Sequence, residues 1–358
     1  MIEGFSIDIA ERALDDLRTR IDATRWPDQV PDVGWTQGTE REYLRGILSY
    51  WRDEFDWRAQ ERWLNSFPHF MWKGIHFVHV RARGGRGMPL ILTHGWPSCF
   101  AEYLALVPHL DSFDLVIPSL PGYGFSQRPP QPGVNYRFVA DRWHALMQEL
   151  GYPRYGAGGG DFGAGVASFL ALDHPESVIG LHLTTLELSP AHDTPGLSEP
   201  ERSYLAVKQR WVDAEHGYSA LQSTKPQTLG YALNDSPAGL AAWLVEKWHS
   251  WTDTTPSNDF LCTLLTIYWA TQTITSSMRD YWDNRFQGVK PTFVTVPTAF
   301  GVFPHHTVAE GEPPREFAER LYRIQRWTVF DRGGHFAPVE HPDLVAADIT
   351  AFFRGLQP

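Results

Sequence analysis

The stretch Gly159-Gly160-Asp161-Phe162-Gly163 is the most informative part of the chain for its fold. It has the small-x-nucleophile-x-small pattern of a nucleophile elbow, a sharp strand-to-helix turn that exposes one side chain above a parallel sheet. The glycines allow the backbone to bend where a Cβ atom would clash. The central aspartate is ionised at neutral pH and can attack carbon without a base to deprotonate it first. The motif therefore predicts a covalent ester intermediate, and substrates such as strained ethers or alkyl halides.

Short apolar strands alternate with helical patterns on both sides of this turn. Strands are predicted at 74–80, 89–93, 113–117, 155–157 and 178–183, and helices at 101–110, 138–150 and 164–172. This alternation predicts a parallel sheet covered by helices. It lapses after about residue 186, where mostly helical patterns indicate a cap inserted between two strands. The strand pattern returns at 292–296 and 326–330, and a helix at 344–353 closes the chain.

These patterns divide the chain into four segments. Residues 1–85 form an N-terminal meander with helical patterns at 10–23 and 40–55. Residues 86–186 and 290–358 form the two parts of the core, and residues 187–289 form the cap. The predicted fold class is α/β, with a mostly parallel sheet, a helical cap insertion and the N-terminal meander.

Composition disfavours several kinds of partner. The 358 residues carry a formal net charge of −11, which argues against nucleic acid or an anionic membrane surface. Cys99 and Cys262 are the only cysteines, and they fit reduced cytosolic thiols better than a disulfide framework. The first residues lack the pattern of a signal peptide, and no apolar run reaches the roughly 18 residues of a membrane span. We therefore expect a soluble, cytoplasmic protein, and a homo-oligomer is compatible with the sequence.

His335 is a candidate base because it follows the last predicted strand, in Gly333-Gly334-His335-Phe336. An elbow nucleophile followed much later by a strand-end histidine is the chain order of α/β-hydrolases. Most of the 15 histidines are expected to be structural, but this position favours catalysis. With an aspartate nucleophile, the histidine would activate water against the ester.

A second motif, His94-Gly95-Trp96-Pro97, follows the strand predicted at 89–93. The backbone N–H of Trp96 is suitably placed to form an oxyanion hole with that of Phe162, directly after the nucleophile. The turn could equally keep its glycine and proline for shape alone, and both interpretations can hold at once.

The chain resembles the microsomal-type epoxide hydrolases and their soluble bacterial relatives over nearly its whole length. The stretches that carry the resemblance are Arg25-Trp26-Pro27, Phe55-Asp56-Trp57-Arg58, Ile75-His76-Phe77-Val78-His79, His94-Gly95-Trp96-Pro97, Pro118-Ser119-Leu120-Pro121-Gly122-Tyr123-Gly124-Phe125-Ser126, Ala232-Leu233-Asn234-Asp235-Ser236-Pro237 and Ser276-Ser277-Met278-Arg279, together with the Asp161 elbow. The resemblance implies an α/β-hydrolase core with a helical lid. It also implies a small-molecule epoxide as substrate, opened to a vicinal diol without cofactor or metal.

The resemblance further implies two ring-opening tyrosines in the cap. By motif they are Tyr218, ahead of Thr224-Lys225-Pro226, and Tyr281, in Arg279-Asp280-Tyr281. An epoxide oxygen becomes an alkoxide as the ring opens, and a phenol can hydrogen-bond to it and protonate it. Asp161 would attack the epoxide carbon while both tyrosines hold the oxygen.

The carboxylate that should orient His335 departs from the family pattern. The family's acid lies in a Phe-Pro-x-acid motif, and here that motif is Phe303-Pro304-His305-His306. Three alternatives stay open: Glu310 reaches back from four residues on, the acid has moved to Glu187 at the end of the strand before the cap, or no acid exists and turnover is slow. Related haloalkane dehalogenases place an acid near the second position, so we favour Glu187 over Glu310. Two adjacent histidines without further ligands do not predict a metal site.

Two alternatives to epoxide hydrolysis arise from the same residues. Haloalkane dehalogenases look similar, but they bind the leaving halide with an indole N–H directly after the nucleophile, and Phe162 has no such donor. A catalytically weak relative that binds a hydrophobic ligand would explain the altered acid position, but it would not require Asp161, His335 and the two tyrosines. The aromatic content of 14%, with 15 Trp, suits a bulky or aryl epoxide. Detoxification and natural-product biosynthesis are equally compatible settings.

Overall fold

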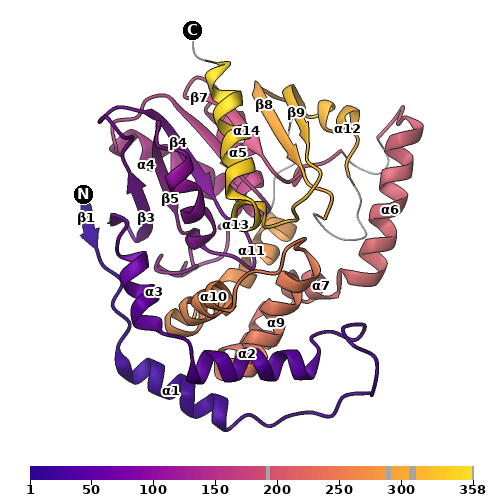
Figure 1. The fold of residues 1–358 in the computed structure, drawn as a ribbon. Coiled ribbons are helices and arrows are strands. Elements are labelled where there is room, and N and C mark those ends of the chain that lie inside the picture. Colours follow the sequence, from indigo (N-terminus) through magenta and orange to yellow (C-terminus); the bar gives the residue numbers. More distant parts are fainter. Residues whose placement is uncertain (191–193, 288–291, 306–311, 357–358) are drawn as a thin grey trace.

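The computed structural model of the protein describes residues 1–190, 194–287, 292–305 and 312–356. Among these residues, nine strands form one sheet in the order β1-β2-β3-β5-β4-β6-β7-β8-β9 (Figure 1). The strands are β1 (Ile2–Phe5), β2 (His69–Trp72), β3 (Ile75–Val80), β4 (Met88–Thr93), β5 (Phe113–Pro118), β6 (Tyr155–Gly159), β7 (Val178–Leu183), β8 (Val294–Val302) and β9 (Tyr322–Val329). From β5 through β4 to β9 every neighbouring pair is parallel, which confirms the predicted sheet.

The central strands are apolar because helices cover the sheet around them. The covering helices are η1 (Phe100–His109, a 3₁₀ helix), α4 (Tyr136–Glu149), α5 (Phe162–Asp173), α12 (Arg315–Glu319), α13 (Ala337–Glu340) and α14 (Pro342–Arg354). Strands β5 and β6 are buried at every position. Glycine in β6 lets α14 approach closely, since a Cβ atom on Gly156 would lie 2.6 Å from the ring of Phe353.

The N-terminal segment contributes more to the sheet than its sequence pattern indicates. Strands β1 and β2 pair antiparallel and extend the sheet beyond β3, the one strand predicted in this segment. Three helices complete the segment: α1 (Glu11–Asp22), α2 (Arg41–Asp53) and α3 (Trp57–Leu64). The strands β1 and β2 have four residues each, and their partners are about 65 positions apart, so no local pattern encodes the pairing.

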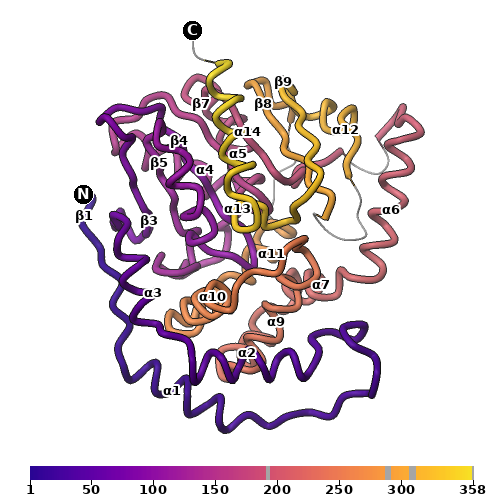
Figure 2. Tube along the Cα trace, in the orientation of Figure 1, coloured from indigo at the N-terminus to yellow at the C-terminus, as the bar shows by residue number. Residues whose placement is uncertain are grey.

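Between β7 and β8, where the cap insertion is predicted, the described residues form six helices. They are α6 (Glu199–Glu215), α7 (Gly217–Gln222), α8 (Pro226–Asp235), α9 (Pro237–Ser250), α10 (Asn258–Thr271) and α11 (Ile274–Gln287). In Figures 1 and 2, helices α7, α9 and α10 lie between the sheet and the pair α1 and α2. The buried indole N–H of Trp51 in α2 donates to the Thr266 hydroxyl in α10 at 2.8 Å. The N-terminal segment therefore holds the cap from the side away from the core.

The last two strands differ from their predicted bounds. Strand β8 extends six residues past the predicted 292–296, and β9 begins at Tyr322 instead of 326. The polar residues Arg323 and Gln325 interrupt the apolar pattern at the start of β9, yet Arg323 pairs with Pro297 of β8.

No helix in the described ranges is long and apolar enough to cross a membrane.

A buried ionic cluster joins β7, β9 and α14. Asp348 of α14 accepts hydrogen bonds from His182 Nε2 at 2.8 Å, Arg326 Nε at 2.6 Å and Thr328 Oγ1 at 2.7 Å. Burial opposes ionisation of Asp348, but these partners outweigh it and lower its pKa to about 2. The ionised carboxylate therefore stabilises the folded state above the pKa of the unfolded side chain, about 3.9.

We predict that Asp348→Ala lowers the free energy of unfolding at neutral pH by roughly 3 kcal/mol, because His182 and Arg326 lose a buried partner. The Asp348 contribution should be lost as the pH falls from about 4 towards about 2, since a lowered folded-state pKa stabilises only the ionised form. Urea unfolding followed by circular dichroism measures both effects. The exposed Asp343→Asn on the same helix is the control, with an expected change of about 0.5 kcal/mol. A loss below that value in Asp348→Ala would show that the cluster contributes little.

Candidate active site

Asp161 sits on a strained turn between β6 and α5. Its φ of 51° and ψ of −132° lie in a region that side chains rarely adopt. A Cβ atom on Gly163 would lie 1.8 Å from the carbonyl oxygen of Thr93, so this position requires glycine. The N–H of Asp161 donates to the Thr185 hydroxyl at 2.9 Å, and the N–H of Gly160 donates to Tyr103 at 3.1 Å. These contacts hold the carboxylate at the carboxyl end of the sheet.

Two backbone N–H groups converge on one oxygen of this carboxylate. The N–H of Trp96 lies 2.9 Å from Asp161 Oδ1, and that of Phe162 lies 2.7 Å from the same atom. A Cβ atom on Gly95 would lie 2.3 Å from Oδ1, so only glycine leaves room for this approach. Burial opposes ionisation of Asp161, but His335 and the two N–H donors outweigh it, and the pKa of Asp161 lies below its ordinary value. The carboxylate is therefore ionised at neutral pH.

His335 faces the other oxygen of the Asp161 carboxylate. Its Nε2 lies 3.5 Å from Asp161 Oδ2. The backbone N–H of His335 donates to the carbonyl oxygen of Trp251 at 2.8 Å, and a Cβ atom on Gly334 would lie 2.3 Å from that oxygen. Glu340 joins the same two loops, because its carboxylate accepts from the N–H groups of Gly334 and Asp253. The cap therefore helps to position the histidine of the core.

Tyr218 of α7 and Tyr281 of α11 bring two phenols to the same site. Their ring centroids lie 6.0 Å apart in an edge-to-face arrangement. Tyr218 stacks on Trp96 at 5.5 Å, and Tyr281 packs on Phe162 at 4.7 Å. Burial and then the neighbouring phenol and Asp161 raise the pKa of Tyr281 well above its ordinary value. The phenol of Tyr281 is therefore protonated at neutral pH and can donate a hydrogen bond into the site.

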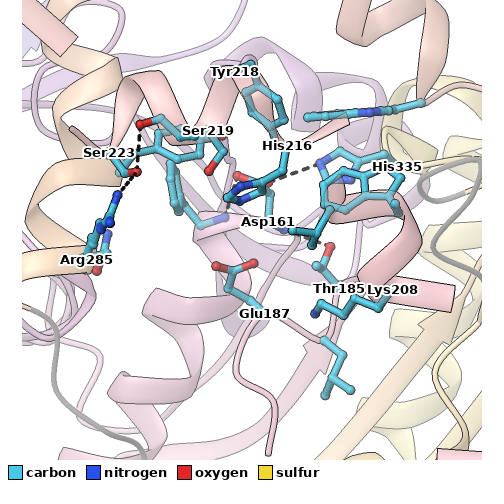
Figure 3. A pocket seen from close by; sticks show the side chains of 18 of the residues that line it. Asp161, Thr185, Glu187, Lys208, His216, Tyr218, Ser219, Ser223, Arg285 and His335 are labelled. Carbon is cyan, nitrogen blue, oxygen red and sulfur yellow. Dashed lines mark hydrogen bonds and ion pairs between the residues drawn. The ribbon is translucent and has the colours of Figure 1, made fainter. Parts of the chain in front are cut away.

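These groups line one cavity of about 630 Å³, a size typical of small-molecule sites (Figure 3). In Figure 3, Asp161 and His335 point toward each other, with Tyr218 and Glu187 on opposite sides of Asp161. The wall contains several more aromatic rings, those of Tyr136, Phe162, Tyr204, Trp211 and Trp251. Lys208, His216 and Arg285 also line it. The cavity thus combines a group of aromatic rings with polar groups that converge near Asp161.

The acid behind His335 stays a prediction. Glu187 lies in the cavity wall, and its Oε1 accepts a hydrogen bond of 2.6 Å from the hydroxyl of Tyr136. Glu310 and His306 lie outside the described residues. His305 Nε2 lies 3.3 Å from Asp253 Oδ1. Among the residues with described positions, no group of three or more histidine, cysteine or acidic side chains is arranged to hold a metal ion.

Sequence patterns missed several residues of the site. Thr185 contacts Asp161, and Tyr136 contacts Glu187. Trp251 contacts His335. These contacts form only because the fold brings together segments that are distant in the sequence. Glu102 of η1 is a further buried carboxyl group. Burial raises its pKa to about 7, while the charge of His335 acts in the opposite direction. Its position directly downstream of the Trp96 turn is the one sequence signal that could have indicated it.

Comparison with known proteins places this chain in a family. A family model for the epoxide hydrolase N terminus matches residues 2–103, and one for the alpha/beta hydrolase fold matches residues 88–228. A putative epoxide hydrolase of Stigmatella aurantiaca is 40% identical, covering 99% of this chain and 86% of its own. Epoxide hydrolase 1 of Sus scrofa is 35% identical, covering 99% of this chain and 89% of its own.

Solved structures agree with this assignment. Juvenile hormone epoxide hydrolase from the silkworm Bombyx mori superposes with a TM-score of 0.92 at 30% identity, covering 99% of this chain and 95% of that one. Aspergillus niger epoxide hydrolase superposes with a TM-score of 0.89 at 27% identity, covering 100% and 97%. The sequence matches and the shared fold together show that this chain belongs to the epoxide hydrolase family, whose members have the α/β-hydrolase fold.

Proposed function

We propose that the protein hydrolyses an epoxide to a vicinal diol through a covalent ester of Asp161. The observation that carries the proposal is the convergence of an ionised carboxylate, two phenols and a histidine on one cavity. The carboxylate and the two phenols have roles in opening a three-membered ether, and the histidine has a role in hydrolysing the ester that forms. The aromatic wall supports a bulky or aryl epoxide, because such a substrate would bury its apolar part against these rings.

In the first step Asp161 attacks an epoxide carbon. Oδ1 is held by the two N–H groups, so Oδ2, which faces His335, is the attacking oxygen. The carbon–oxygen bond of the ring breaks, and its electron pair stays on the epoxide oxygen. Tyr218 and Tyr281 hydrogen-bond to that oxygen, and one of them gives it a proton. The product of this step is an ester between the carbon and Oδ2.

In the second step His335 removes a proton from a water molecule, and the hydroxide attacks the carboxyl carbon of the ester. Negative charge then develops on Oδ1, which already accepts from the N–H groups of Trp96 and Phe162. Each such donor stabilises the transition state by about 3 kcal/mol. The bond between the carboxyl carbon and Oδ2 breaks, and the protonated His335 gives its proton to Oδ2, so the diol leaves with Oδ2. The enzyme keeps the oxygen from water, whose remaining proton passes through solvent to the tyrosine phenolate and restores both side chains.

Dehalogenation fits the site less well. The residue directly after the nucleophile is Phe162, whose ring offers no N–H to a halide, whereas the phenols of Tyr218 and Tyr281 suit an alkoxide oxygen. A ligand-binding relative without activity has no need of the strained elbow at Asp161, because such strain persists where function requires it.

We predict that a single turnover of styrene oxide in ¹⁸O-water places the label in the Asp161 carboxylate and leaves the first diol unlabelled. The reason is that the water oxygen enters at the ester carbonyl carbon and Oδ2 departs with the diol. Mass spectrometry of the Asp161 peptide and of the diol measures both positions. Label in the first diol, with none in the protein, would rule out the covalent route.

We predict that His335→Gln forms the ester but hydrolyses it at least about 100-fold more slowly, since the general base is lost. The ester should accumulate and be visible as an intact-mass increase equal to the substrate. Asp161→Asn is the matched control and should show no increase. Unchanged turnover in His335→Gln would remove the histidine from the mechanism.

The triad acid is tested by comparing Glu187→Gln with Glu310→Gln. Replacing the residue that acts as the triad acid should slow ester hydrolysis by at least about tenfold, because the protonated histidine loses its counter-charge. We expect this effect in Glu187→Gln, whereas ring opening should change little. Rapid-quench measurement of the ester separates the two steps. If neither variant slows hydrolysis, both assignments are wrong.

A further inference from the structure

A buried lysine lies directly behind the ring of Tyr218. Lys247 of α9 has only 5% of its surface exposed, although lysine is rarely buried without a partner. Its ammonium nitrogen lies 4.5 Å from the ring centroid of Tyr218 and 5.6 Å from that of Trp251. The carboxyl end of α9 thus brings the ammonium group of Lys247 to Tyr218. Trp251, directly after this helix, brings its carbonyl group to the N–H of His335.

The counter-charge of Lys247 is more exposed to solvent than Lys247 itself. Glu246 forms an ion pair with it, and the Glu246 carboxylate also accepts from the Ser250 hydroxyl at 3.1 Å. The Glu246 side chain is 20% exposed and lines a groove beside the N-terminal segment, whereas the Lys247 side chain is 7% exposed. Solvent therefore screens the carboxylate more than the ammonium group, which faces two aromatic rings.

We propose that Lys247 is a positioning residue that promotes epoxide ring opening by stabilising negative charge on Tyr218. The inference rests on the proposed epoxide hydrolysis. A cation over a phenol ring is attracted by the electrons of the ring, and this attraction grows when the phenol gives up its proton. The proton passes from the Tyr218 hydroxyl to the alkoxide, and the electron pair stays on the phenolate oxygen. Lys247 keeps its own protons throughout, and water later returns the proton to Tyr218.

Other groups around Tyr218 do not favour a negative charge on its phenol, so a nearby cation can lower the cost of forming that charge. The negative charge of Asp161 raises the pKa of the neighbouring Tyr281 and so opposes formation of any phenolate at the site. The ring of His216 lies 6.4 Å from that of Tyr218, and the pKa of His216 is lowered by burial and then by nearby Arg285 and Lys208, which favours its neutral form. Lys247 contributes a buried positive charge that contacts the ring of Tyr218.

The test separates ring opening from ester hydrolysis in single turnovers of styrene oxide, with the ester quantified by rapid quench. Lys247→Met removes the charge and keeps most of the side-chain length. We expect it to slow ring opening about tenfold or more, from the lost attraction to a developing phenolate, while ester hydrolysis stays within about twofold. Lys225→Met, at an exposed lysine of the same cap, is the matched control and should change neither step.

A double-mutant cycle with Tyr218→Phe decides whether Lys247 acts through the phenol. Phenylalanine cannot carry the negative charge, so Lys247→Met should slow ring opening by less than about twofold in that background. An equal effect in both backgrounds, or an equal slowing of both chemical steps, would overturn the inference and assign Lys247 to packing. Wild-type protein that forms no Asp161 ester would instead overturn the proposed function.

Lys247→Arg keeps the test decisive if Lys247→Met does not fold. Arginine retains the charge and stacks on aromatic faces, so ring opening should stay within about threefold of the wild-type rate. A loss of tenfold or more in a folded Lys247→Arg, persisting in the Tyr218→Phe background, would contradict a role for the charge.

Discussion

The pair of hydrogen bonds from Trp96 and Phe162 to Asp161 Oδ1 is the contact on which the site depends. It directs one carboxylate oxygen into the protein and leaves the other facing His335. The contact requires an unusual backbone at Asp161 and glycine at position 95, where a Cβ atom would meet the carboxylate. The parallel strands β4 and β6 bring the two N–H groups together, because both strands end at the same edge of the sheet. In the proposed mechanism the same geometry serves both chemical steps.

The helices of the cap help to position residues of the core at the site. The carbonyl oxygen of Trp251 accepts the backbone N–H of His335, and the rings of Tyr218 and Tyr281 pack on Trp96 and Phe162, whose backbone N–H groups donate to Asp161. The N-terminal helices hold the cap from the opposite side through contacts such as Trp51 with Thr266. A substitution far from Asp161 in α2 or α9 can therefore change the catalytic geometry, since these layers are close-packed.

The carboxyl groups near the site differ in pKa because their neighbours differ. Asp161 is ionised because two N–H groups and a histidine outweigh its burial, whereas Glu102 has a raised pKa because its partners do not. Glu187 is engaged by the phenol of Tyr136 at the cavity wall. Such differences follow from neighbours that are distant in the sequence, so residue type alone does not reveal them.

The sequence by itself determined the elbow, the parallel core and the helical stretch between two of its strands, because glycine spacing and apolar periodicity are local properties. Tyr218 and Tyr281 were predicted from the resemblance to a family, since no local pattern distinguishes them from other tyrosines. The sequence did not reveal β1 and β2, the full length of β8 and β9, or the contacts of Lys247 and Trp251. Those features depend on pairing between segments far apart in the chain, and a polar residue such as Lys247 has the same local signature whether exposed or buried. Only the tertiary structure decided which oxygen of Asp161 faces His335, since that choice is made by two N–H groups from separate turns.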